Sequence, residues 1–338
     1  MKNKASLLLA IESSCDETSA AVFENEVLLS NVTATQKVHE AFGGVVPELA
    51  SRAHIQNIIP VVSEALKKAG KEAADLTAIG FTQAPGLIGS LLVGVCFAKG
   101  MAQALDIPLI AVNHLQAHVL AHWIEAPRPA FPFLCLTVSG GHTQIVKVND
   151  HLDMEIIGKT IDDAAGEAFD KIAKMLGLPY PGGPLVDKYA RDGDPHAFTF
   201  PVPEMKGYDF SFSGIKTAVL YFLQKQKQAD PGFIQDNLRD ICASVQYTIV
   251  RALMIKLEKA AKDLDIREIG IGGGVSANSG LRDALVAYGR KHNWKTYLPA
   301  FQFCTDNAAM IGMTAYYKML RGRFADLAVV PAAKVSWQ

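Results

Sequence analysis

Two histidines, at positions 114 and 118, are the residues whose type and spacing most clearly indicate chemistry. Side chains four residues apart lie on one face of a helix, so both imidazoles of His114-Leu-Gln-Ala-His118 can reach a single cation. His122 repeats the spacing and competes for the same role. The alternative is a helix with partly buried histidines that bind nothing, and the pattern alone leaves both open.

The residue after the first histidine indicates which metal chemistry is available. A zinc protease of the H-E-x-x-H type carries its general base there, whereas this chain has Leu115. A metal site without a hydrolytic base is therefore predicted, and a metalloprotease is disfavoured. Two imidazoles still need oxygen donors, and we expect a carboxylate from the other lobe of the protein to supply one.

Two glycine-rich turns could contact a nucleotide. Gly272-Gly-Gly-Val-Ser-Ala-Asn278 leads from a strand into a helix, where glycines allow close backbone approach and the helix supplies N–H donors. It has neither the Walker A form nor the G-x-G-x-x-G spacing, so a structural turn is an open alternative. Ser139-Gly-Gly-His142, between two strands, could present backbone amides to an anion.

Three further segments carry polar residues with both a binding and a structural interpretation. Residues 162–171 place Asp170 in a helix of small residues, where solvated charge is the alternative. The loop 180–184, followed by Asp187, combines rigid prolines with flexible glycines and could shape a ligand site or form an ordinary turn. Residues 209–216 resemble a strand edge that runs into a helix, where they could bind ligand or cap that helix.

The elements that must position these residues form a repeated pattern. A strand, a small polar turn and a return strand occur in residues 6–29 and again in residues 133–148. We interpret this as an internal duplication, with two unrelated hairpins as the alternative. Strands alternate with helices between and after the copies, which predicts an α/β protein.

The spacing of apolar residues places helices around the candidate site. A strand at 109–112 leads directly into a helix that begins at Asn113 and carries both histidines. Prolines at 127, 129 and 132 indicate a lobe boundary. Other helices are predicted over residues 47–70, 89–105, 160–176, 238–264 and 307–321.

Composition limits the classes of function. The 338 residues are 49% hydrophobic, and 33 Lys plus Arg nearly balance 34 Asp plus Glu. A protein that binds nucleic acid through bulk charge is usually basic, so contact with RNA would need a local patch or a partner protein. The candidate basic residues are Lys256, Lys259, Lys262, Lys318, Arg321 and Arg323.

Targeting signals are weak, and we expect a cytoplasmic protein that does not associate with membranes. The apolar run Leu7–Ile11 is too short for a signal peptide, and Leu87–Ala98 is too short to span a bilayer. The five cysteines form no C-x-x-C pair, which is typical of buried thiols in a reducing compartment.

Taken together, the motifs resemble one family over essentially the whole chain, the bacterial TsaD family, once described as glycoproteases. Nine short motifs in register are far more specific than any one of them. The resemblance is carried by residues 11–18, 43–52, 114–118, 138–143, 162–171, 180–184, 210–216, 272–278 and 303–307.

The resemblance implies an actin-like ATPase or sugar kinase fold, with two duplicated RNase H-like lobes and a ligand cleft between them. The expected N-terminal lobe comprises residues 1–132 and 307–338 and carries the metal histidines and partner-docking helices. The expected C-terminal lobe comprises residues 133–306 and binds the adenylate. With these boundaries Asp306 reaches the metal from the opposite lobe.

The resemblance also implies an acyltransferase. It transfers threonylcarbamoyl from L-threonylcarbamoyladenylate to N6 of the adenosine at position 37, beside the anticodon, in tRNAs that read codons beginning with A, and it releases AMP. His114, His118 and Asp306 would ligate one divalent metal per subunit, which orients and activates the adenylate. Fe²⁺ is the first choice for this metal, with Zn²⁺ as the alternative. The adenylate would contact Thr137, Val138, Ser139, Gly140, Gly141, Asp170, Gly183, Asp187 and Asn278.

The exocyclic amine of adenine is a poor nucleophile, so we expect a nearby carboxylate to accept its proton, with Asp16 or Glu17 as the candidate. The family implies two protein partners, an inactive paralogue, TsaB, and a small ATPase, TsaE. The helix at 47–70 is either the docking face for a partner or ordinary lobe packing. A metalloprotease and a nucleotide-binding scaffold or ATPase are the competing functions.

Overall fold

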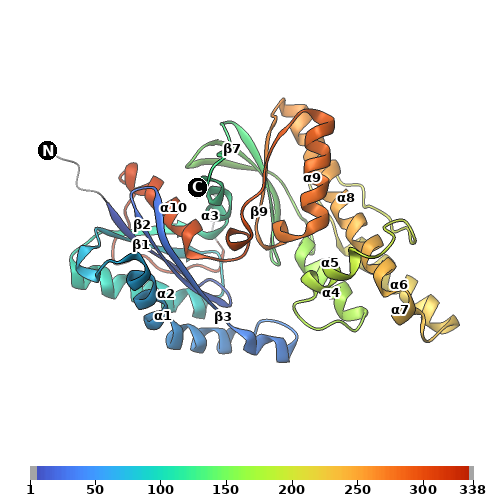
Figure 1. Ribbon diagram of the computed structural model, residues 1–338, viewed down its shortest axis with the longest axis horizontal. Helices are drawn as coiled ribbons and strands as arrows, with labels where there is room; N and C mark the ends of the chain where they lie inside the picture. Colours follow the sequence, from blue (N-terminus) through green and yellow to red (C-terminus); the bar gives the residue numbers. More distant parts are fainter. Residues whose placement is uncertain (1–5, 335–338) are drawn as a thin grey trace. The chain divides into compact units, whose positions relative to one another are not determined.

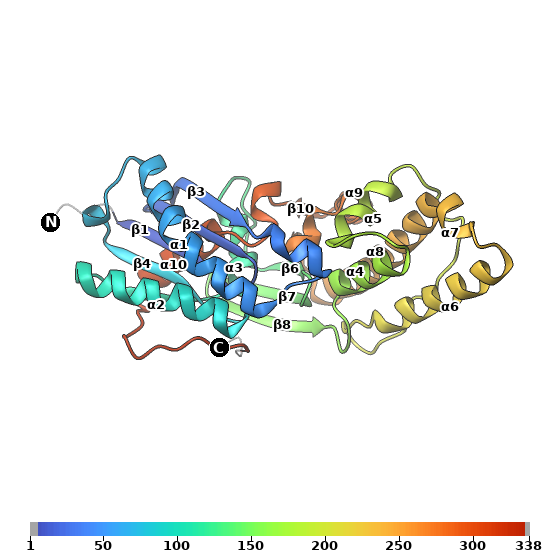
Figure 2. The ribbon, with the colours of Figure 1, turned by 90° about the horizontal axis from the view of Figure 1, so that it is seen from below.

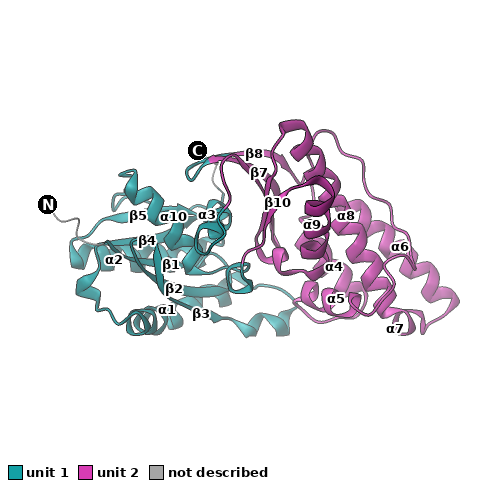
Figure 3. Cartoon of the chain, turned by 45° about the horizontal axis from the view of Figure 1, so that its top comes forward, with its two compact units in different colours: residues 1–128, 150–154, 300–338 teal, residues 129–149, 155–299 magenta. Residues whose placement is uncertain are grey.

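The computed structural model describes residues 6–334, and these residues fall into two compact units (Figure 3). Unit 1 comprises Met1–Arg128, Asp150–Met154 and Ala300–Gln338. Unit 2 comprises Pro129–Asn149 and Glu155–Pro299. Each unit is built around its own five-stranded sheet.

The sheet of unit 1 has the strand order β3-β2-β1-β4-β5 (Figure 1). The first three strands form an antiparallel meander, and β4 and β5 extend it in parallel to β1. The strands are β1 (Leu7–Glu12), β2 (Glu17–Glu24), β3 (Val27–Thr35), β4 (Ala78–Ala84) and β5 (Leu109–Asn113).

Helices cover both faces of this sheet (Figures 1 and 2). Successive side chains of a strand point to opposite faces, so Leu9 and Ile11 of β1 pack with α1 (Pro47–Ala69) and α2 (Ile88–Leu105). On the other face Gly80 of β4 lets α10 (Ala308–Leu320) approach closely, because a Cβ there would lie 2.6 Å from Ala315 Cβ. Unit 1 also contains η1 (Lys37–Phe42), η2 (Ala73–Asp75), α3 (His114–Leu120), η3 (Ala121–Trp123) and η5 (Phe301–Phe303).

The sheet of unit 2 repeats the plan of unit 1, with the order β10-β9-β6-β7-β8. Again an antiparallel hairpin comes first, and β9 and β10 join β6 in parallel. The predicted internal duplication is therefore confirmed. The strands are β6 (Phe133–Val138), β7 (Thr143–Asp150), β8 (Asp153–Lys159), β9 (Glu268–Gly272) and β10 (Lys295–Tyr297).

The helices of unit 2 pack on apolar residues of this sheet such as Leu136 and Ile271 to form one core. A longer insertion separates β8 from β9 here than separates β3 from β4 in unit 1. The helices are α4 (Ala165–Met175), α5 (Gly182–Ala190), α6 (Ser213–Ala229), α7 (Phe233–Asp236), α8 (Leu238–Leu264), η4 (Gly274–Ala277) and α9 (Ser279–His292).

Several sequence-based boundaries need correction. The return strand predicted within residues 6–29 ends at Glu24, and a turn separates it from a further strand, β3. The helix expected from residue 160 begins at Ala165, because residues 160–164 are tied to neighbouring segments, for example by Thr160 N, which donates to Thr143 O of β7 at 2.9 Å.

The expected lobe boundary at 306/307 is also wrong, because Ala300–Gln338 belongs to unit 1. Asp306 therefore lies in the same unit as both histidines, and the expectation that it comes from the opposite lobe fails. Its neighbour Asn307 begins α10, and Ala308 N donates to Ser19 Oγ of β2 at 2.9 Å. These contacts anchor the segment to the sheet of unit 1.

Among residues 6–334, α2 is the one helix whose length and composition would allow it to cross a bilayer. A core helix of a globular protein passes the same test, and α2 packs against β4 and α1. Gly94 of this helix has a packing role, because a Cβ there would lie 2.3 Å from Ser13 Oγ.

Candidate functional site

The two histidines lie at the start of a short helix that is capped by its own sequence. Asn113, the last residue of β5, accepts hydrogen bonds from Leu115 N at 2.9 Å and Gln116 N at 3.3 Å. This cap starts α3 at His114 and places His118 one turn later on the same face. The two rings meet edge to face with centroids 4.7 Å apart.

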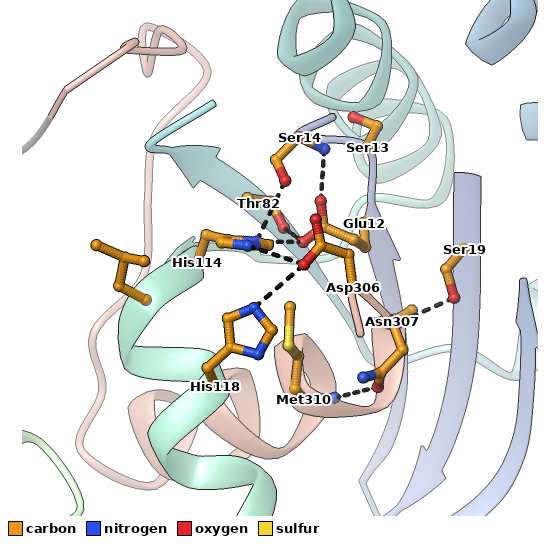
Figure 4. A network of polar contacts seen from close by, with 12 residues as sticks. Glu12, Ser13, Ser14, Ser19, Thr82, His114, His118, Asp306, Asn307 and Met310 are labelled. Atoms are coloured by element: carbon orange, nitrogen blue, oxygen red, sulfur yellow. Dashed lines mark hydrogen bonds and ion pairs between the residues drawn. The ribbon is translucent and has the colours of Figure 1, made fainter. Parts of the chain in front are cut away.

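Asp306 completes a set of three converging donor atoms (Figure 4). Its Oδ1 lies 3.2 Å from His114 Nε2 and 3.1 Å from His118 Nε2. Asn307 caps α10 by accepting from Met310 N at 3.0 Å, which fixes the backbone next to the carboxylate. His122, one turn beyond His118, lies in η3 and is not part of this group.

The geometry of this group fits a divalent cation. Its three ligand atoms all lie within 4.8 Å of one another. Ligand atoms about 2.1 Å from one ion lie roughly 3.0–3.4 Å apart at octahedral or tetrahedral angles, which is the range of the two Asp306–histidine separations. Two imidazoles and one carboxylate are also a donor set that binds transition metals.

Sequence reasoning missed a fourth functional residue, Glu12. Its Oε2 accepts a hydrogen bond from His114 Nδ1 at 2.9 Å and one from Thr82 Oγ1 at 2.7 Å (Figure 4). Its Oε1 accepts from Ser14 N at 2.5 Å, and the residue is fully buried. A carboxylate that holds Nδ1–H leaves Nε2 free as a ligand, the usual arrangement behind a metal-bound histidine. The available signal was an acidic residue at the end of an apolar strand.

The two histidines are supported unequally. His114 has Glu12 behind it, whereas the buried Nδ1 of His118 has no hydrogen-bond partner within the described part of the chain. The orientation of His118 therefore depends on its packing in α3 and on its contact with Asp306.

The charges of the group are strongly coupled. Burial alone would lower the pKa of His114, but the carboxylates of Asp306 and Glu12 raise it well above its usual value. Burial would raise the pKa of Asp306, yet His114 and His118 hold it below its usual range. Burial would raise the pKa of Glu12 as well, but His114 lowers it below its usual value. The negative charges of Glu12 and Asp306 thus favour a positive charge between them, and in the metal-free protein a protonated His114 supplies it.

The two candidate proton acceptors, Asp16 and Glu17, lie in the same electrostatic environment. Burial and the negative charges of Asp306 and Asp16 raise the pKa of Glu17 to about 10. Ser14 Oγ of the β1–β2 turn lies 3.2 Å from His114 Nδ1, so this turn lies close to the three donor atoms. The raised pKa of Glu17 favours its protonated form, so this carboxyl must be ionised before it can accept a proton.

In unit 2 the turn between β6 and β7 presents open backbone. Ser139 N donates to His142 O at 2.8 Å, which closes the turn, and Gly140 and Gly141 are exposed. A Cβ on either glycine would have no atom within 4 Å. Gly166, in contrast, packs under the turn, since its Cβ would lie 2.6 Å from Ser139 O.

The glycine-rich segment after β9 approaches the same region. Pairing of β6 with β9 places Thr137 opposite Gly272. Gly273 has φ +83°, and a Cβ there would lie 2.4 Å from Val138 O. The glycine at 273 is thus required by a close approach of two backbones, and the predicted ligand residues Thr137 and Val138 lie buried beside it.

The remaining predicted ligand residues of unit 2 form hydrogen bonds that shape helix termini. Asp170 Oδ1 accepts from Gly182 N and Gly183 N, both at 2.9 Å, at the start of α5. Burial raises the pKa of Asp170, although these two hydrogen bonds oppose the shift.

A second carboxylate links α5 to α9. Asp187 Oδ1 accepts from Ser279 N at 3.0 Å and from Ser279 Oγ at 2.5 Å. Asn278 caps α9 by accepting from Leu281 N at 3.0 Å and donates its amide to Gln246 Oε1 at 2.6 Å. The structure therefore brings Asp187 together with Asn278, and Asp170 together with Gly183.

Two other acidic residues of the segment 162–171 have a structural role. Asp163 forms salt bridges with Lys171 and Lys216 at 2.9 and 2.8 Å. Asp162 accepts from Phe212 N at 2.8 Å and from Ser211 Oγ at 2.6 Å, so it holds the segment that leads into α6. Both carboxylates thus connect α4 to α6.

The fold and the donor group define a class of protein, an actin-like ATPase or sugar kinase fold with a histidine-rich site that could hold a metal. Two solved structures share the fold at low sequence identity. One is full-length HypF in a phosphate- and nucleotide-bound form, with TM-score 0.62 and 12% identity over 95% of this chain and 47% of that one. The other is component A of (R)-2-hydroxyglutaryl-CoA dehydratase from Acidaminococcus fermentans, with TM-score 0.54 and 14% identity over 93% and 99%.

Sequence comparison is more specific. The family model described as TsaD, tRNA N6-adenosine threonylcarbamoyltransferase, matches residues 27–313. A protein of that name from Christiangramia forsetii is 60% identical over 97% of both chains. Another from Riemerella anatipestifer is 60% identical over 98% of both. The chain belongs to the TsaD family, and the resemblance found in its motifs is confirmed.

Proposed function

We propose that this chain transfers the threonylcarbamoyl group of L-threonylcarbamoyladenylate to N6 of the adenosine at position 37 in tRNAs that read codons beginning with A. The observation that carries the proposal is the convergence of His114, His118 and Asp306 on one point in a member of a tRNA-modifying transferase family. We place the reaction in the cytoplasm.

We assign these three residues to one divalent metal per subunit, Fe²⁺ in preference to Zn²⁺. When bound, the cation would neutralise negative charge on the donor phosphate and polarise the carbonyl that is attacked. Glu12 holds the proton of His114 on Nδ1, so Nε2 is available as a ligand. Asp306 faces both imidazoles through one oxygen, Oδ1, which leaves its second oxygen for other contacts.

We assign the adenylate contacts to unit 2. The exposed backbone of Gly140 and Gly141 can approach anionic oxygens, because no side chain lies in the space above it. Asp170 and Asp187 hold the N-termini of α5 and α9 in place, so they shape the surface on which Gly183 and Asn278 would meet the nucleotide. Thr137, Val138 and Ser139 form the strand end that carries the turn.

The transfer forms a bond between N6 and the carbamoyl carbon and breaks the bond from that carbon to the phosphate oxygen, which leaves with its electron pair as AMP. The amine loses one proton in this step. We assign its acceptance to Asp16, or to Glu17 once that carboxyl is ionised, in the β1–β2 turn beside Asp306. The adenine that receives the threonylcarbamoyl group must leave its stack, which an anticodon loop allows at a cost of roughly a few kcal/mol.

We propose that the protein acts with the paralogue TsaB and the ATPase TsaE. The near-zero net charge is unusual for a protein that holds tRNA alone. Unit 1 exposes an apolar surface on α1 and α2, which pack against each other, and we assign it to TsaB. Its residues are Ile55, Ile59, Ile88 and Leu92.

Nucleoside mass spectrometry of tRNA tests the proposed function. Cells depleted of this protein should lose threonylcarbamoyladenosine, wild type should restore it, and His118→Ala should not. The Ser30→Ala variant, which removes a hydrogen bond to Ala65 O far from the site, is the matched control and should restore it. Undiminished modified nucleoside after depletion would contradict the activity, and full rescue by His118→Ala would contradict the role of the site.

A further inference from the structure

His54 lies on the inner face of α1, with none of its surface exposed, and both of its ring nitrogens contact the segment Cys15–Thr18, which leads from the β1–β2 turn into β2. Nε2 lies 2.9 Å from the carbonyl oxygen of Cys15, and Nδ1 lies 2.7 Å from Thr18 Oγ1. A carbonyl oxygen can only accept, so Nε2 carries the proton. Nδ1 of the neutral ring then accepts from the threonine hydroxyl.

The two contacts lie on either side of Asp16 and Glu17. The backbone of the turn is held at a third point, because Gln36 N donates to Asp16 O at 3.2 Å. The side chain of Gln36 in turn donates to Ala50 O of α1 at 3.3 Å. The turn that carries both carboxylates is therefore attached to α1 directly and through the segment that precedes η1.

Packing alone does not explain a histidine at this position. Other inward residues of α1, such as Ala50, Ile58 and Val61, are apolar. A fully buried imidazole loses its hydration, and only hydrogen bonds offset that loss. Here both bonds go to one four-residue segment, Cys15–Thr18, so the arrangement specifies where that segment lies relative to the helix.

We propose that His54 is a positioning residue for the transfer reaction. It fixes the segment Cys15–Thr18, and thereby the carboxylates of Asp16 and Glu17, relative to the sheet and to Asp306. This inference rests on the proposed function, in which one of these carboxylates accepts the proton of N6. Thr18 contributes to the same positioning, because its hydroxyl donates a hydrogen bond to Nδ1, the other ring nitrogen of His54.

Steady-state kinetics of threonylcarbamoyl transfer, with partners, adenylate and tRNA present, tests the proposal on four variants. His54→Leu removes both contacts and is expected to lower kcat about 100-fold, since a misplaced catalytic group costs that much. Thr18→Val removes one contact and is expected to lower kcat about 10-fold, whereas Thr18→Ser keeps the hydroxyl and should retain the wild-type rate. KM for the adenylate and for tRNA should stay within about twofold of wild type, because no binding group changes.

Ser30→Ala is the matched control. It removes another buried hydrogen bond to α1, from Ser30 Oγ to Ala65 O at 2.7 Å, without touching the turn, and should leave kcat unchanged. Amide hydrogen exchange supplies a readout of position that needs no reaction. Exchange at residues 15–18 should accelerate in His54→Leu and Thr18→Val and stay as in wild type in Ser30→Ala.

Each outcome decides one proposal. If wild type forms no threonylcarbamoyladenosine in this assay, the proposed function falls, and the positioning role falls with it. If wild type is active and Thr18→Val keeps its full kcat, the positioning role alone is wrong. A loss in Ser30→Ala equal to that in Thr18→Val would reduce His54 to a stabiliser of α1. If His54→Leu does not fold, Thr18→Val against Thr18→Ser still decides.

Discussion

The two hairpin turns of the duplicated sheets occupy equivalent positions and carry opposite chemistry. Between β1 and β2 the four-residue turn Ser13–Asp16 is followed by Glu17, and its Ser14 contacts both Glu12 and His114. Between β6 and β7 the four-residue turn Ser139–His142 holds two exposed glycines and no carboxylate. The first concentrates negative charge, and the second offers backbone amides.

The supports of the two turns differ in the same way. The acidic turn is held from outside, by His54 of α1 and by Leu87 N, which donates to Ser14 O at 2.8 Å. The glycine turn closes on itself and rests on Gly166. One copy of the fold has thus become a site that attracts a cation, and the other a site that can admit an anion.

The largest expected effect separates the two copies. Asp306→Ala removes the carboxylate that faces both histidines. Loss of a residue that only hydrogen-bonds a metal ligand typically lowers metal affinity by up to roughly 100-fold. We expect bound metal and transfer activity to fall by more than that. Adenylate binding by unit 2 should persist. Metal analysis and calorimetric titration with a non-hydrolysable adenylate measure the two sides. If Asp306→Ala kept its metal but lost adenylate binding, the assignment of the metal to unit 1 and of the adenylate to unit 2 would be wrong.

Glu12→Gln is expected to have the next largest effect, a loss of about 10–100-fold in metal affinity, because the amide orients His114 less strongly. The pH dependence should also change. Glu12 and Asp306 raise the pKa of His114 in the metal-free protein, so protons compete with the cation below that pKa, and affinity falls as pH falls. Removing the Glu12 charge lowers that pKa and moves the competition to lower pH. Metal titrations at several pH values measure both changes, and a pH profile identical to that of wild type would contradict the coupling.

A pair of glycine substitutions tests the glycine turn. Gly166→Ala places a methyl group against Ser139 O and should destabilise the protein by about 1–3 kcal/mol. Gly140→Ala adds the same group in open space and should change stability by less than about 0.5 kcal/mol, while weakening adenylate binding. Denaturant unfolding and ligand titration give the two values. If Gly140→Ala binds adenylate as wild type does, this glycine is not a contact.

The smallest expected effect concerns the N-terminus of α5. Asp170→Ala leaves Gly182 N and Gly183 N without their acceptor, which should cost about 1 kcal/mol of stability, as for the loss of a helix cap. Metal content should not change, since Asp170 belongs to unit 2. Thermal unfolding with metal analysis checks both expectations, and a loss of metal would show that the two sites are not independent.

Local patterns predicted much of this architecture. The helices over 47–70 and 238–264 and the strand at 133–138 lie where apolar spacing places them, and Gly70 ends the first of these helices. The strands β3 and β8 were missed because their polar residues alternate irregularly at the edges of the sheets. The two candidate metal-binding histidines, His114 and His118, could be identified from their spacing on one helix.

Contacts between distant segments could not be predicted in the same way. Asp306 was identified only through the family resemblance and was assigned to the wrong lobe, because nothing local shows that residues 300–306 return to the first sheet. Glu12 was missed since it ends an apolar strand and its partner His114 lies 102 positions away. His54 contacts a backbone carbonyl, an acceptor that every residue possesses and that leaves no signal in the sequence.

The central claim is that His114, His118 and Asp306 hold a divalent metal that the transfer requires. Its most direct test is the rate of threonylcarbamoyladenosine formation as Fe²⁺ is titrated into chelated protein with partners, adenylate and tRNA present. We predict no turnover in the chelated protein and full recovery at one metal per chain. Full turnover in protein shown to contain no metal would contradict the claim.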